Sequence, residues 1–195
     1  MPGVSAMIRS AKAEIGYRES GTNQTKFNRW LGKISGYPHD GYGYPWCHSF
    51  LSWCLAQSDN SEAGPRTAGR EAGVLRFKAR SRFHSTPKVG DFVYYGPHGG
   101  THVELVVEVT RSSIVTVGGI TSGSLDGRYY NRDGVYRKTV QRGRDRIYGY
   151  GRPAHPALPS KPKPAKPNPD PLEAIVRKLA HLKIGDGRQD NDPLK

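Results

Sequence analysis

The sequence predicts an α+β fold in which helices come first and antiparallel strands follow. Up to about residue 82, apolar side chains recur at the spacing of amphipathic helices. From Thr86 onward the chain changes to short runs of β-branched and aromatic residues, separated by glycine and proline turns. Helices and strands that are segregated along the chain, instead of alternating, are typical of this fold class.

Three helices are expected in the first part of the chain. The first carries its apolar residues on one face, at Val4, Met7, Ile8, Ala11 and Ile15. The second is expected around Thr25–Leu31 and the third over Cys47–Gln57, with a loop rich in glycine, proline and tyrosine between them. The polar stretch Ser58–Arg82 has room for one more short helix.

The later part contains three clear strand patterns, DFVYY, HVELVVEV and SIVTV. After them, NRDG separates Tyr129–Tyr130 from VYRKTV and predicts the turn of a hairpin, while RIYGYG can close an antiparallel sheet. Residues 1–152 therefore form the expected folded domain.

A proline-rich stretch follows this domain. From Arg152 to Pro171, 8 of 20 residues are proline, which predicts an extended linker over residues 153–171. Residues 172–195 show an amphipathic helix pattern that is too short to form a core alone. Three interpretations of this segment remain open: the start of a further domain, an assembly helix, or a helix that docks back onto the domain.

The composition is strongly basic, with a net charge of +13. Such a charge favours binding to polyanions, whether nucleic acid, anionic lipid or anionic wall polymer. The most basic segment, RYYNRDGVYRKTVQRGRDR, is interpreted as a solvated face, so no nucleic-acid partner is expected. No apolar run is long enough to span a membrane, and the first residues lack the apolar core of a signal peptide. Synthesis in the cytoplasm is therefore expected, with any action outside the membrane requiring separate release.

The only two cysteines, Cys47 and Cys54, fall on the third predicted helix. Two helical turns separate them by roughly 10.5 Å, whereas a disulfide needs Cα atoms within about 7 Å. A metal site is also disfavoured, because there is no Cys-x-x-Cys pair and His48 is expected to point off the cysteine face. Cys54 is expected in the helix interior as a small apolar side chain. Cys47 opens the helix, where the helix dipole favours a thiolate, although a second buried cysteine fits the pattern equally well.

A nucleophilic cysteine requires a histidine. Of the seven histidines, His102 stands out because it opens a strand pattern whose alternation places Val103 and Leu105 on a core face. His102 and Glu104 then share the opposite face. A surface histidine at the start of a strand is the alternative.

Four segments in order resemble the CHAP domain (cysteine, histidine-dependent amidohydrolase/peptidase), as found in endolysins of actinobacteriophages. They are PWCHSFLSWCLAQ, TPKVGDFVYYG, THVELVVEV and IYGYGRP. The resemblance covers about Ala6 to Pro153. It implies a papain-like α+β fold, Cys47 as nucleophile and His102 as general base. It also implies peptidoglycan as substrate, cut at an amide of the stem peptide, the cross-bridge or the muramoyl–alanine link, and the start of a truncated wall-binding module after the linker.

The sequence departs from the family where a polar residue usually orients the histidine. In VGGITSG, Gly118 and Ile120 occupy those positions, and neither side chain can hydrogen-bond an imidazole. Glu104 is the best replacement, because it lies two residues from His102 on the same strand face. An ordinary solvent-facing glutamate, with the histidine held by a backbone carbonyl or water, is the alternative.

Aromatic residues before Cys47 are expected to contact substrate, namely Tyr42, Tyr44 and Trp46. A hydroxyl of Tyr42 or Tyr44 is also expected to assist the Cys47 backbone N–H in binding an oxyanion. Some relatives bind calcium in this loop, but Asp40 is its only carboxylate, so neither a metal nor another cofactor is expected. One rival hypothesis is a secreted bacterial CHAP hydrolase for wall remodelling, which should show a signal peptide. The other is a non-enzymatic basic module that binds cell wall or nucleic acid.

Overall fold

The chain divides into two units, Met1–Leu158 and Pro159–Lys195, and every residue described here belongs to the first. The computed structural model describes residues 3–33, 43–125, 128–143 and 146–155. The predicted linker from residue 156 onward and the predicted C-terminal helix therefore lie outside the described residues, as does the predicted start of a wall-binding module.

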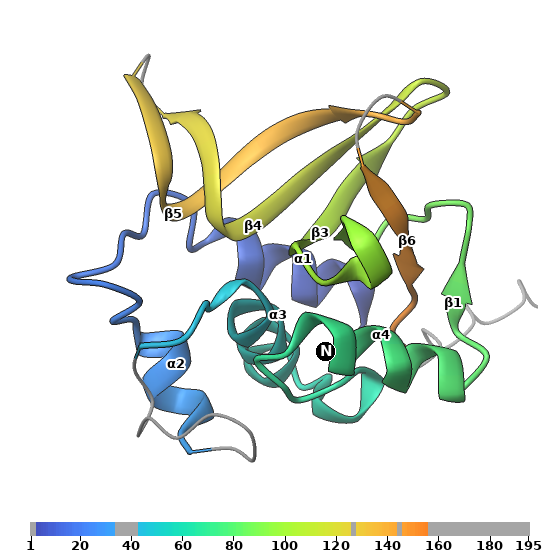
Figure 1. Cartoon of the computed structure of the whole chain (residues 1–195), viewed down its shortest axis with the longest axis horizontal. Coiled ribbons are helices and arrows are strands. Elements are labelled where there is room, and N and C mark those ends of the chain that lie inside the picture. Colours follow the sequence, from blue (N-terminus) through green and yellow to red (C-terminus); the bar gives the residue numbers. More distant parts are fainter. Residues whose placement is uncertain (1–2, 34–42, 126–127, 144–145, 156–195) are drawn as a thin grey trace, which may run out of the picture. The chain divides into compact units, whose positions relative to one another are not determined.

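Helices occupy the first part of the described chain, as predicted (Figure 1). The hydroxyl of Thr25 caps the second helix by accepting the backbone N–H of Asn28 at 3.1 Å. No described helix is long and apolar enough to cross a membrane. The helices are α1 (Val4–Lys12), α2 (Lys26–Leu31), α3 (Cys47–Gln57) and α4 (Arg70–Ala79), with 3-10 turns η1 (Ser61–Ala63) and η2 (Pro97–Gly99).

The strands described in this chain form one antiparallel sheet in the order β1-β6-β2-β3-β4-β5. This arrangement confirms the predicted α+β class with helices packed on an antiparallel sheet. The strands are β1 (Phe83–His84), β2 (Phe92–Tyr95), β3 (His102–Val109), β4 (Ser113–Leu125), β5 (Arg128–Gln141) and β6 (Ile147–Gly151).

The predicted hairpin turn at NRDG is wrong. These four residues lie inside β5, which runs from Arg128 to Gln141 and pairs with β4 from Leu125 back to Ser113. β5 continues through Asp133 and Gly134 because its pairing with β4 is irregular. The register shifts between Gly118 and Thr121 and again between Thr121 and Gly123. Leu125 at the end of β4 therefore pairs with Arg128 at the start of β5, and β4 is much longer than the SIVTV pattern indicated.

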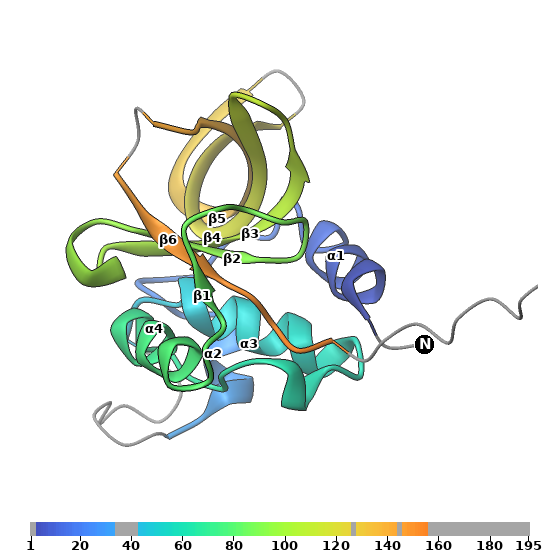
Figure 2. The same ribbon diagram turned by 90° about the vertical axis from the view of Figure 1, so that its right-hand side faces the viewer.

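The sheet packs on the helices with one face and curls over the other (Figures 1 and 2). The β4–β5 end closes into an arc. As a result both faces of β3 are buried. Val103, Leu105 and Val107 pack against the helices, and Val106 packs inside the arc with Ile114.

Helix α3 lies at the centre of the helical layer and is buried almost all round. An aromatic group packs against its first turns, with the rings of Phe27 and Trp46 stacked at 5.5 Å and Phe27 edge-on to Phe50 at 5.1 Å. Each such pair contributes about 0.5–1.5 kcal/mol beyond its buried area. This packing fixes the beginning of α3, where Cys47 lies.

Candidate active site

Cys47 is the first residue of α3, so its backbone N–H belongs to the group of helix donors that no helical carbonyl accepts. The preceding Trp46 is fully buried, and its indole N–H donates to Glu19 at 2.8 Å. The side chains before and after Cys47 are therefore held by the core, and the sulfur stands at the positive end of the helix dipole.

His102 is the first residue of β3 and lies opposite Tyr95 of β2, whose ring stacks on the imidazole at 5.9 Å. Its Nε2 lies 3.0 Å from Oε1 of Glu104. Because Nε2 is engaged there, Nδ1 is the nitrogen left for the hydrogen bond between His102 and the thiol of Cys47. The structure thus brings together the three residues that the sequence analysis named as catalytic candidates.

The charges of this group favour a thiolate–imidazolium pair. Burial alone would raise the pKa of the Cys47 thiol, but the hydrogen bond and charge of His102, with the charge of Arg70, hold the pKa below its ordinary value. Burial alone would lower the pKa of His102, but its hydrogen bonds to Cys47 and Glu104 and their negative charges raise that pKa to about 9. Each member of the pair therefore favours the charged form of the other.

Glu104 is fully buried, which excludes the solvent-facing alternative. Burial alone would raise the pKa of its carboxyl, but the hydrogen bond and charge of His102, and then the charge of Lys138, hold it well below the usual range. The carboxylate also accepts hydrogen bonds at 2.6–2.9 Å from the hydroxyls of Tyr95, Thr116 and Thr121. A buried carboxylate with this many donors is a fixed negative charge that orients the imidazole.

Sequence reasoning missed the residues that support this group. Tyr95, Thr116, Thr121 and Lys138 come from three strands and surround Glu104 because β2 and β4 pair with β3 and β5 pairs with β4. Thr121 does lie in VGGITSG, the segment whose departure from the family pattern the sequence analysis noted. That segment therefore still supports the histidine, although it does so through Glu104.

Arg70, at the start of α4, was also missed. Its Nη1 lies 3.9 Å from the sulfur of Cys47, and its Nε donates to the carbonyl of Gly100 at 2.6 Å. The guanidinium is therefore fixed beside the thiolate and adds a second positive charge to that of His102. No sequence signal marked it, because it lay in a polar stretch that predicted only a short helix.

Gly118 explains why the carboxylate can sit at position 104. A Cβ at Gly118 would lie 2.5 Å from Cγ of Glu104. The glycine on β4 therefore leaves the space that the Glu104 side chain fills, and the two positions are complementary across the β3–β4 pair.

We expect Gly118→Ala to destabilise the protein by about 1–3 kcal/mol, because the added methyl group forces a fully buried side chain to shift. Denaturant unfolding measures the change. Gly21→Ala is the matched control, since its Cβ would make only ordinary contacts from 3.4 Å outward to the flexible side chain of Gln24. Equal stability of the two variants would contradict the packing described for Gly118.

The predicted substrate-binding aromatics have different surroundings. Tyr44 is buried, and its hydroxyl donates to the carbonyl of Gly32 at 3.0 Å. Trp46 is buried in the aromatic group of the core. The geometry therefore gives no support to a substrate-contacting role for either side chain, or to the Tyr44 hydroxyl as an oxyanion donor. Tyr42 lies outside the described residues.

His48, which was expected to point off the cysteine face, does not face solvent. The residue is fully buried, and its Nε2 lies 2.9 Å from the hydroxyl of Tyr94. The sheet and α4 cover this side of α3, so that even its polar residues are enclosed. Cys54 is fully buried, and burial raises the pKa of its thiol well above the ordinary value. Both described cysteines are free.

A pocket of about 340 Å³ opens beside His102. Cys47 does not line it and is only 1% exposed. The residues that line the pocket are Tyr95, Thr101, His102, Ile120, Thr121, Arg132 and Lys138.

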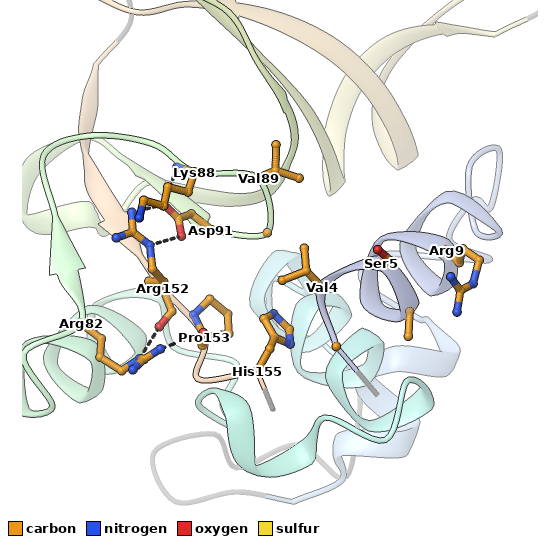
Figure 3. A pocket seen from close by; sticks show the side chains of 13 residues that line it. Val4, Ser5, Arg9, Arg82, Lys88, Val89, Asp91, Arg152, Pro153 and His155 are labelled. Carbon is orange, nitrogen blue, oxygen red and sulfur yellow. Dashed lines mark hydrogen bonds and ion pairs between the residues drawn. The ribbon is translucent and has the colours of Figure 1, made fainter. Parts of the chain in front are cut away.

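A second cavity of about 510 Å³ is lined by residues from the start of α1 and by Arg82, Asp91, Arg152 and His155 (Figure 3). Its charged groups are largely paired, because Arg152 binds Asp91 at 2.8 Å and Arg82 donates to the carbonyl of Arg152. It contains none of the three catalytic candidates. Within the described ranges, no group of three or more His, Cys, Asp or Glu residues is arranged to hold a metal.

Comparison with known proteins gives one family match and several structural likenesses. None of the curated proteins compared with the chain matches it. The P60 domain of an antigen from M. avium subspecies paratuberculosis has a TM-score of 0.46 at 17% identity, covering 77% of this chain and 93% of that one. The peptidoglycan hydrolase RipB from Mycobacterium tuberculosis has a TM-score of 0.47 at 17% identity over 79% of this chain.

A mutated form of the resuscitation-promoting-factor-interacting protein RipA has a TM-score of 0.46 at 15% identity, over 78% of this chain. The chain spans 65% of the RipB chain and 62% of the RipA chain. In the sequence comparison, residues 39–119 match the model of the CHAP domain. The segment that carries Cys47, His102 and Glu104 is therefore similar to the CHAP domain.

Proposed function

We propose that this protein is a cysteine-dependent peptidoglycan hydrolase that cleaves an amide bond of the wall peptide. The observation that carries the proposal is the contact of Cys47, His102 and Glu104 inside the segment that matches the CHAP domain. The arrangement joins a nucleophile, a proton-transfer group and a residue that orients it, which is the set that covalent hydrolysis of an amide requires.

In the first half of the reaction, the thiolate of Cys47 attacks the amide carbonyl. The backbone N–H of Cys47 donates to the developing oxyanion, and the Arg70 guanidinium beside the sulfur is the second donor in this proposal. His102 then donates its proton to the leaving nitrogen, so that the C–N bond breaks, an amine departs and a thioester to Cys47 remains.

In the second half, the neutral His102 accepts a proton from water while the water oxygen attacks the thioester carbonyl. The tetrahedral intermediate collapses, expels the thiolate and releases a carboxylic acid. Cys47 and His102 thereby return to the charged pair. Glu104 stays ionised throughout and holds the ring in place through Nε2.

The activity is expected to depend on pH as a bell-shaped curve. The rate falls in acid as the Cys47 thiolate is protonated. The midpoint of this acid limb lies below the ordinary thiol pKa, because the pKa of Cys47 is lowered. The rate falls in alkali as His102 loses its proton, with an apparent pKa of about 9. The pH profile of kcat/KM measures both limbs, and an alkaline limb near the ordinary histidine value of about 6.5 would contradict the assignment.

Digestion of purified cell walls tests the proposal. The protein is expected to release soluble peptides with new amino groups, and alkylation of its thiols is expected to stop the release. Mass spectrometry of the products then distinguishes cleavage in the stem peptide, in the cross-bridge and at the muramoyl–alanine link. Release that persists after Cys47 is fully alkylated would refute the cysteine mechanism.

We further propose that the enzyme acts as a phage endolysin, made in the cytoplasm and released to the wall. The net charge of +13 supports attraction to a wall that bears anionic polymers. Loss of turbidity of an actinobacterial cell suspension is the expected result. A protein that shifts nucleic acid with a steep salt dependence and releases nothing from walls would instead be the basic binding module.

A further inference from the structure

The pocket beside His102 is positively charged. Arg132 and Lys138 line it together with His102, and no described acidic residue does. Lys138 has one of its three donors on Glu104 at 2.9 Å, which leaves the others for the pocket, and its side chain is 33% exposed. Arg132 is exposed and has no hydrogen-bond or ion-pair partner among the described residues.

The neighbouring carboxylate does not neutralise Arg132. Asp133 accepts a hydrogen bond from Arg18 at 2.7 Å through Oδ2 and from Tyr136 at 3.0 Å through Oδ1. Both of its oxygens are thus engaged on other residues. The guanidinium of Arg132 remains available for an anion that enters from solvent.

The backbone around this pocket is strained in two places. Ile120 has φ of 55° and Arg132 has φ of 58°, a region that non-glycine residues rarely adopt and β-branched residues avoid. The pairing of β4 with β5 is also irregular here, because its register shifts on both sides of Thr121. Strain and bulges of this kind concentrate at functional sites, where they direct side chains that regular strands would direct elsewhere.

The strand that follows Arg132 is anchored on the N-terminal segment. The N–H of Glu19 donates to the carbonyl of Asp133 at 3.0 Å, and the N–H of Val135 donates to the carbonyl of Tyr17 at 2.9 Å. The backbone that carries Arg132 is therefore tied to the rest of the domain immediately after the strained residue. A fixed backbone reduces the cost of ordering the guanidinium around a ligand.

We propose that this pocket is a subsite for a free carboxylate of the wall peptide next to the scissile amide, with Arg132 as its specificity-determining residue. This inference rests on the proposed function. A planar guanidinium pairs with a carboxylate through two parallel hydrogen bonds, and Lys138 adds a point charge. Ile120 offers an apolar contact to the alkyl chain that bears the carboxylate. Because His102 lines the same pocket, the bound carboxylate lies close to the bond that is cut.

Two synthetic peptides test the subsite after the scissile amide has been identified from wall digests. They are identical except that the carboxylate next to this amide is free in one and a carboxamide in the other. The native protein is expected to cleave the free acid at least about tenfold better in kcat/KM, mainly through KM. Arg132→Gln is expected to bring this ratio close to one, and Arg132→Lys to keep part of it.

Arg111→Gln is the matched control, because it removes the same charge from an exposed arginine in the turn between β3 and β4, and it is expected to keep the native ratio. A native ratio near one, or an unchanged ratio in Arg132→Gln, would overturn the subsite.

Calorimetric binding of both peptides to Cys47→Ala, with and without Arg132→Gln, separates the subsite from catalysis. The free acid is expected to bind at least about tenfold more tightly only when Arg132 is present. If the native protein still releases peptides from walls after Cys47 is fully alkylated but this binding difference holds, the cysteine mechanism of the proposed function fails and the subsite stands. If cleavage occurs without any binding preference, the subsite fails alone.

Discussion

Cys47→Ala is expected to abolish the release of peptides from purified walls, a fall of at least about 10⁴-fold in kcat. The sulfur is the only described thiol that hydrogen-bonds His102, so the thioester is not expected to form without it. The fold is expected to survive, because the substitution removes one atom from the edge of the core. Rates on walls, together with denaturant unfolding, measure both parts of this prediction.

Cys54→Ala is the matched control, since it makes the same change two turns later on the same helix. Cys54 is fully buried and does not contact His102, so the variant is expected to lose about 1 kcal/mol of stability and to keep its activity. If Cys47→Ala cleaved walls at the rate of Cys54→Ala, the nucleophile would have to be reassigned.

Glu104→Ala is expected to cost about 3–5 kcal/mol of folding free energy in addition to most of the activity. The substitution leaves the ammonium group of Lys138 and the hydroxyls of Tyr95 and Thr121 near a cavity without their common acceptor. His102 also loses the group that fixes its ring. Unfolding by denaturant gives the stability change, and kcat gives the catalytic one.

Glu104→Gln separates charge from packing. The amide has nearly the same size as the carboxylate. Its NH2 group, however, faces hydrogen-bond donors, whereas both oxygens of the native carboxylate accept hydrogen bonds from them. The activity is expected to fall about 10²-fold or more, and the alkaline limb of the pH profile is expected to move below 9, because Glu104 no longer raises the pKa of His102.

Glu108→Gln, on the same strand, is the control for Glu104→Gln. Its side chain is 50% exposed and pairs with Arg137, so both stability and the pH profile are expected to stay close to native. An alkaline limb that stays in place in Glu104→Gln would show that the carboxylate does not set the charge of His102.

Much of the candidate site could be predicted because it depends on local periodicity. Cys47 opens a helix whose apolar spacing is plain, and the alternation along HVELVVEV places Glu104 on the same side of the strand as His102. Both inferences concern neighbours along one element. The third catalytic candidate was therefore found even though the family position for it is occupied by glycine.

The rest of the site depends on the order and register of the strands in the sheet, which single strands do not encode. Thr116, Thr121 and Lys138 are far from Glu104 in sequence, and they meet it because β4 pairs with β3 and β5 pairs with β4. The sequence also left open whether Glu104 faces solvent, and the sheet buries it. The turn at NRDG was misplaced because a strained Arg132 lets the strand continue through turn-forming residues.

The central claim is that the thiolate of Cys47 meets the imidazolium of His102, and the pH dependence of alkylation of Cys47 tests it most directly. The native protein is treated with iodoacetamide across a pH series, and the modified peptide is identified by mass spectrometry, with Cys54 as the internal control. The account predicts that Cys47 reacts at pH values well below the ordinary thiol pKa of about 8.5, and that His102→Ala moves its profile up to that value while Cys54 stays unmodified. A Cys47 profile that rises only near 8.5 in the native protein, and does not change in His102→Ala, would contradict it.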